Sequence, residues 1–186
     1  MFGNIAAIWG FAGVCLFLGS AIVRLGQIGL QINIVDLEVK HWLVMVIWIS
    51  FMAYYEGYKG FQKGFSPRVA ARLRYLKDNA NYKRLMLAPL FCLGYFDAER
   101  RRIIFVCCLT LVIFLIIQLV EYIPMPWRAI LDLGVVVGLG WGLTSMIIFT
   151  IQAFNGEDVL IIDKETGNMY IDGNIVENQG TLTPDP

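Results

Sequence analysis

Residues 103–120 read IIFVCCLTLVIFLIIQLV, a run of 18 positions without a charged side chain. A helix of roughly 20 predominantly apolar residues crosses the hydrocarbon core of a bilayer, which is about 30 Å thick. The run is therefore typical of a transmembrane helix. Two further uncharged runs of this kind cover residues 1–23 and 133–154.

The composition of the whole chain agrees with this interpretation. Of the 186 residues, 58% are hydrophobic and 16% are charged, and the mean hydropathy is +0.63. An average soluble domain has about 45–50% apolar and about 25% charged residues. This difference excludes an ordinary soluble domain, and the aperiodic glycines and four cysteines exclude collagen-like and disulfide-dense chains. We therefore expect an all-α integral membrane protein.

A fourth span is predicted from a weaker run. Between Lys40 and Glu56 only residues 41–55 are uncharged, but Glu56 and Lys59 can reach the headgroups, so that the helix extends to about residue 61. The first run has no preceding positive charge and exceeds the apolar region of a signal peptide, so we expect a permanent helix there. The expected transmembrane domain, residues 1–154, thus contains spans at 4–23, 41–61, 103–122 and 130–153.

The positive charges predict the orientation. Eleven of the 15 lysines and arginines lie between Lys59 and Arg102. Because positive residues near span ends stay in the cytoplasm, we expect segment 59–102 and, after four crossings, both termini to be cytoplasmic. The compact loops and the lack of an Asn-x-Ser/Thr sequence fit a bacterial inner membrane.

Segment 59–102 contains a predicted amphipathic helix. Ser66-Pro67 is a typical helix start, and Val69, Leu73, Leu76 and Ala80 form an apolar stripe beside basic residues. Such a helix lies on anionic lipid or docks an acidic partner, whereas one short basic helix does not indicate nucleic-acid binding. The candidate contacts with headgroups or a partner are Lys59, Lys63, Arg68, Arg72, Arg74 and Lys77.

Two stretches flank this helix. Residues 57–65 repeat glycine-aromatic pairs between lysines, which favours an anchor in the membrane interface over a phosphate-binding loop. Residues 85–96 form an apolar run of 12 residues, interrupted by Pro89 and Gly94. This run is too short to span, and its sequence leaves an interfacial, a re-entrant and a protein-buried position open.

Small residues form one face of the last span. Gly134, Gly138 and Gly142 recur every fourth position, which allows close approach of two helices in lipid. The neighbour is either another span of the same chain or another subunit.

Three carboxylates are candidates for intramembrane charge: Glu56, Glu121 and Asp132. All three can reach an interface, and Arg128 can pair with either of the last two, so a structural role is favoured over a proton relay. One histidine, His41, and four cysteines without a Cys-x-x-Cys pair predict no catalytic, cofactor or metal site.

The tail, residues 155–186, has a different character. It has seven acidic residues and one lysine, a balance of −6, and its pattern predicts a β-hairpin over residues 158–172. We expect an acidic cytoplasmic tail.

Taken together, these features favour a non-enzymatic multi-pass protein that acts as a scaffold or accessory subunit of a larger membrane complex. Its expected partners are anionic lipid and other membrane subunits or further copies of itself. A small oligomeric channel or transporter is the alternative, although polar span residues are few. A lipid-acting enzyme using Glu56 beside Tyr54, Tyr55 and Tyr58 is a weaker alternative.

Overall fold

The part of the chain that the computed structural model describes is predominantly helical, as the composition predicts. It comprises residues 2–31, 37–78, 82–96, 100–155, 161–162, 168–171 and 174–178. The helices are α1 (Phe2–Gly29), α2 (Val39–Met52), the π-helix η2 (Ala53–Phe65), α3 (Ser66–Asp78), α4 (Tyr82–Met86), α5 (Ala88–Leu93), α6 (Arg100–Val120) and α7 (Trp127–Asn155).

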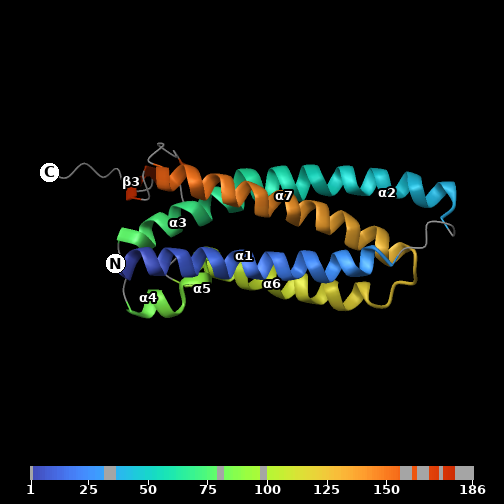
Figure 1. Ribbon diagram of the computed structural model, residues 1–186, viewed down its shortest axis with the longest axis horizontal. Coiled ribbons are helices and arrows are strands. Elements are labelled where there is room, and N and C mark those ends of the chain that lie inside the picture. The colour runs from blue at the N-terminus through green and yellow to red at the C-terminus, as the bar shows by residue number, and fades with distance from the viewer. Residues whose placement is uncertain are drawn as a thin grey trace.

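The long helices lie along one axis of the molecule. Figure 1 shows α1, α2, α6 and α7 running along its length, with α3, α4 and α5 gathered at the end where α1 begins and α7 ends. α7 is the central element, because it packs against η2, α1, α3 and α2. Helix α2 continues into η2 without a break, since Ala53 keeps right-handed helical dihedral angles.

Three of the described helices are long and apolar enough to cross a membrane. They are Gly3–Gly29, Ile103–Val120 and Trp127–Asn155, which correspond to three of the predicted spans. The predicted span 41–61 is not among them, because α2 has 14 residues before the winding changes from α to π. Length and composition of single helices therefore support three spans, not the expected four.

The buried core lies at the end of the molecule that carries α3. Leu73 and Leu76 of α3 are fully buried, together with Val14 of α1 and Met146 of α7. Val69, a further member of the predicted apolar stripe, is buried as well, and Ala80 lies outside the described residues. The predicted interfacial helix therefore packs its apolar side onto α1 and α7 of its own chain.

One side of the short apolar run 85–96 is buried in protein, whereas Met86, Leu87 and Leu90 are exposed. Ala88, Phe91 and Cys92 of α5 are buried in the same core as α3. Burial raises the pKa of the Cys92 thiol to about 12, so this side chain acts as an apolar core residue. α5 ends at Gly94, whose φ of 91° is a left-handed conformation that suits glycine.

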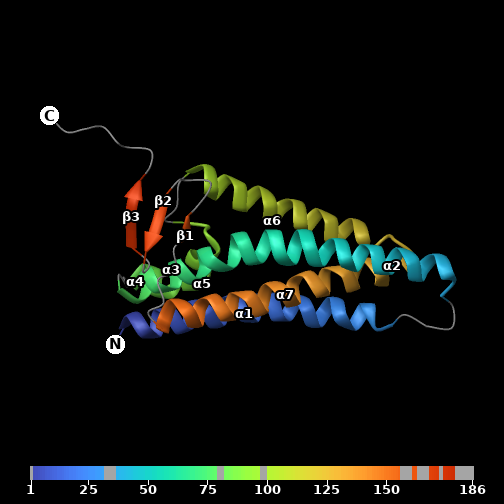
Figure 2. The same ribbon diagram turned by 90° about the horizontal axis from the view of Figure 1, so that it is seen from above.

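Helix α6 stands apart from the other long helices. None of residues 103–120 is buried, and within the part of the chain that the structure describes α6 has no extended contact with another element. Two polar contacts attach it: Arg24 of α1 lies 3.5 Å from Glu121, directly after the end of α6, and the hydroxyl of Tyr95 lies 2.6 Å from that of Thr110 in the middle of α6. Figure 2 shows α6 diverging from the rest of the molecule toward its first residue, Arg100.

Three short strands are described in the tail. They are β1 (Ile161–Ile162), β2 (Asn168–Ile171) and β3 (Asn174–Asn178), paired antiparallel in that order. The predicted hairpin over 158–172 remains a prediction, because residues 158–160, 163–167 and 172 lie outside the described residues.

Candidate functional site

The glycine face of α7 is covered by α2 and η2 of the same chain. Trp48 lies on Gly134, Glu56 on Gly138 and the ring of Phe61 on Gly142. A Cβ atom added at Gly138 would lie 2.7 Å from Glu56 Oε2, closer than real Cβ contacts allow. Of the two neighbours that the sequence left open, the structure has the intrachain one.

The winding of η2 sets this register. A π-helix closes its hydrogen bonds between residues five apart, and the Ser66 N–H donates to Phe61 O in that pattern. Glu56, Phe61 and Ser66, each five residues after the last, therefore all face α7. In an α-helix with 3.6 residues per turn, residues five apart lie on well-separated faces.

Ser66 closes this row with buried hydrogen bonds to α7. Its Oγ lies 2.7 Å from Ser145 Oγ and donates to Gly142 O at 3.4 Å. The expected start of a helix at Ser66 is correct, but its side chain binds α7 and does not cap α3. The cap is unnecessary because Ser66 continues η2 with helical dihedral angles.

Glu56 is a charged side chain in an apolar contact. Its Oε2 is buried and has no hydrogen-bond partner among the described residues. Next to it, Gly57 is buried against Trp141, whose Nε1–H donates to Gln62 Oε1 at 2.8 Å. An unpaired carboxylate inside a membrane bundle is costly, which makes Glu56 the candidate for a protonated or functional group in this site.

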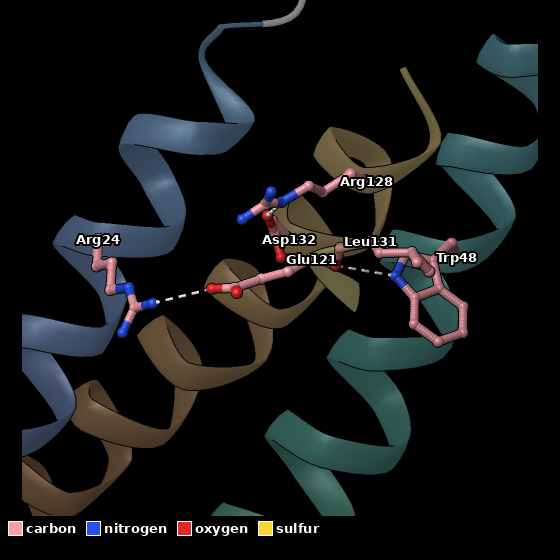
Figure 3. Close-up of polar contacts among 6 residues, drawn as sticks. All are labelled: Arg24, Trp48, Glu121, Arg128, Leu131 and Asp132. Atoms are coloured by element: carbon pink, nitrogen blue, oxygen red, sulfur yellow. Dashed lines mark hydrogen bonds and ion pairs between the residues drawn. The ribbon is translucent and has the colours of Figure 1, made fainter. Parts of the chain in front are cut away.

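A second polar group joins the helices at the opposite end (Figure 3). Arg24 pairs with Glu121 at 3.5 Å, and Arg128 lies 3.9 Å from Asp132 on the next turn of α7. Trp48 Nε1–H donates to Leu131 O at 3.2 Å. Of the two partners expected for Arg128, the structure has Asp132, while Glu121 links α6 to α1.

Asp132 is the most buried carboxylate of this group. Its exposed fraction is 5%, and its Oδ2 has no hydrogen-bond partner among the described residues. His41 is also buried here, where its Nδ1 accepts from the Glu38 N–H and its ring meets Trp127 edge-on at 4.8 Å. The described residues contain no group of three potential metal ligands.

The arginines of α3 bind carbonyl groups of the protein. Arg68 Nε donates to Gly64 O near the end of η2, and Arg74 Nη1 donates to Ala153 O near the end of α7, both at 2.8 Å. Arg72 Nη1 donates to Phe91 O at 2.5 Å in α5. Because helix C-termini carry unpaired carbonyls and partial negative charge, Arg72 and Arg74 stabilise the ends of α5 and α7. Arg68 binds a carbonyl at the junction of η2 and α3.

The expected lipid or partner contacts are thereby divided into two groups. Arg68, Arg72 and Arg74 are half-buried with acceptors in their own chain, and Lys77 lies over the Phe154 ring at 5.3 Å. Lys59 and Lys63 are exposed on η2. These two lysines are the ones that remain in position to meet a headgroup.

Sequence reasoning missed the aromatic partners of the glycines and the π-helix. The glycine-aromatic repeat of residues 57–65 was a visible signal, because Gly57 and the Phe61 ring both pack on α7. No family model, curated protein or solved structure matches the chain.

Proposed function

We propose that the chain is a four-span scaffold or accessory subunit of a larger complex in a bacterial inner membrane, with both termini in the cytoplasm. One observation carries the proposal: α6 contains the apolar run 103–120, in which no residue is buried and most are exposed. In lipid, helices associate through close packing and hydrogen bonds, and among the described residues α6 has no extended packing contact with another element along residues 103–120 and one hydrogen bond there, between Thr110 and Tyr95. Its free surface suits a transmembrane helix of a partner.

The fourth span in this proposal is α2 together with η2. These two segments are continuous and run along the bundle, antiparallel to α1 and parallel to α7 (Figure 1). At about 1.5 Å per residue the 14 residues of α2 cover about 21 Å, and the first residues of η2 provide the rest of a core about 30 Å thick.

A channel is less well supported. The Thr144 hydroxyl donates to Gly140 O of its own helix, and Ser145 Oγ donates to Gly142 O and contacts Ser66. Thr144 is exposed while Ser145 is buried, so that these polar groups do not share one lining.

The topology follows from the four-span proposal and is testable. Reporter fusions after Lys77 and at the C-terminus should both read cytoplasmic, whereas a fusion after Met125 should read external. Reporter fusions after Gln31 and after Lys77 test the fourth span itself, because α2 and η2 lie between these positions. The two should read on opposite sides, and the same side for both would mean that α2 and η2 do not cross and would leave three spans.

The subunit proposal predicts lateral contacts of α6 in native membranes. A photoreactive residue at Val112, exposed on α6, should yield one discrete protein adduct, which mass spectrometry identifies. The matched control is Leu16, equally apolar and exposed on α1, which should give lipid adducts alone. An adduct of twice the chain mass would identify a second copy as the partner, and lipid adducts at both positions would contradict the proposal.

A further inference from the structure

The outward face of η2 is a continuous aromatic surface. Tyr54 and Tyr55 are 56% and 51% exposed, and their ring centroids are 5.2 Å apart. Phe51 continues this surface on one side, at 4.6 Å from the Tyr55 ring, and Tyr58 on the other, at 5.9 Å from the Tyr54 ring. Such a row of rings suits the boundary between acyl chains and headgroups.

Two lysines extend this surface at its end. Lys59 Nζ lies 5.6 Å from the centroid of the Tyr55 ring, four residues earlier. Lys63 Nζ lies 4.6 Å from the centroid of the Tyr58 ring, five residues earlier. In a π-helix, residues four apart and residues five apart both lie on the same face of the helix. The Tyr55–Lys59 pair and the Tyr58–Lys63 pair therefore lie side by side on η2.

The two ammonium groups are available for a ligand. Both lysines are exposed, while the arginines of α3 bind helix carbonyls. A hydrogen bond with the Tyr58 hydroxyl raises the pKa of Lys63, which keeps its side chain charged. The surface therefore has two fixed cations, three phenol hydroxyls and an apolar ring row below them.

The depth of this surface also points to a lipid. If α2 begins at the outer boundary, its 14 residues reach about 21 Å into the core, which leaves Tyr54 to Lys63 at the opposite boundary. At that level the available anion is the phosphodiester of a membrane lipid, and its acyl chains lie toward the bilayer centre. This placement rests on the proposed fourth span.

We propose that Tyr54, Tyr55, Tyr58, Lys59 and Lys63 form a binding site for one anionic glycerophospholipid of the leaflet at this end. The two ammonium groups bind the headgroup phosphate, and the tyrosine hydroxyls donate to its phosphate and ester oxygens. The rings, continued by Phe51, contact the first part of the acyl chains. Charge complementarity selects an anionic headgroup over a zwitterionic one.

The test is native mass spectrometry of the purified full chain in mild detergent, titrated with phosphatidylglycerol or phosphatidylcholine. The unaltered protein should retain one phosphatidylglycerol and bind phosphatidylcholine weakly. Because each lysine near a headgroup contributes about 1 kcal/mol, the double change Lys59→Gln with Lys63→Gln should weaken phosphatidylglycerol binding about 30-fold.

Two further double variants serve as controls for charge and for folding. Lys77→Gln with Lys83→Gln removes the same charge at the same end and should leave binding unchanged. Lys59→Arg with Lys63→Arg keeps both charges and should retain binding, which separates lost binding from lost folding. An equal loss in both glutamine variants, or equal binding of the two lipids, would overturn the site. The reporter fusions test the fourth span separately.

Discussion

Gly142→Leu is expected to lower the free energy of unfolding by about 3 kcal/mol or more. A Cβ atom at Gly142 meets Phe61 ring atoms, including Cδ2 at 2.9 Å, and the ring is itself packed against the buried core. A leucine therefore has to push η2 away from α7. That movement also breaks the hydrogen bonds of Ser66 with α7.

Gly140→Leu is the matched control, since it makes the same change two residues away on the same helix. No atom lies within 4 Å of a Cβ added at Gly140. The control therefore has the same gain in helix propensity without a clash and should be as stable as the unaltered protein. Reversible unfolding in detergent, followed by circular dichroism, measures both variants, and equal stability of the two would contradict this packing.

Arg72→Met is expected to cost about 2 kcal/mol, because it removes a charged donor from buried carbonyl groups. Arg72 Nη1 donates to Phe91 O at 2.5 Å and to Phe96 O at 3.4 Å. Its guanidinium also lies 5.0 Å from the Phe91 ring centroid. Methionine retains the apolar length of the side chain but cannot donate to either carbonyl.

Lys83→Met is the control for this change, because Lys83 is an exposed cation on the neighbouring helix α4. It should leave the unfolding midpoint in detergent unchanged. Arg72→Lys should recover a minor part of the loss, since an ammonium has no planar fork with which to reach two carbonyls and stack on a ring. If the methionine variant at position 72 is as stable as that at position 83, Arg72 does not hold α5 in place.

The sequence predicted the apolar helices and the close-packed face of α7 for simple physical reasons. A run such as 103–120 has no alternative to a bilayer, and glycines at positions 134, 138 and 142 recur with the period of an α-helix. The neighbour of that face was open because the pattern specifies a close approach, not a partner. Trp48 and Phe61 come from a segment far away in the chain.

The role of α3 was predicted less well, because two environments require the same pattern. An apolar stripe flanked by arginines suits an anionic bilayer surface and equally suits a protein core surrounded by helix ends. The stripe with Leu73 and Leu76 gave no sign that carbonyls of α5 and α7 would lie beside Arg72 and Arg74. That information resides in the tertiary structure.

The π-helix was not predicted for a related reason. Residues 53–65 have an amphipathic pattern that fits the α-helical period, so the sequence indicates an ordinary helix there. Glu56, Phe61 and Ser66 all face α7 because they are spaced five residues apart in a π-helix. The spacing indicates a π-helix only when it is known that Gly138 and Gly142 lie opposite these residues.

The unequal lengths of the helices imply an uneven response to hydrophobic mismatch. At about 1.5 Å per residue, the 28 residues of α1 and the 29 of α7 extend about 42 and 44 Å, whereas the 21 of α6 extend about 32 Å. α1 and α7 are therefore longer than a hydrocarbon core of about 30 Å. α1 packs against α3 and α5, and α7 packs against α3, at the end that extends beyond this core. α6 matches the core, and among the described residues it has no extended contact with another element. A change in bilayer thickness would thus tilt α6, while α1 and α7 keep their arrangement with α3 and α5.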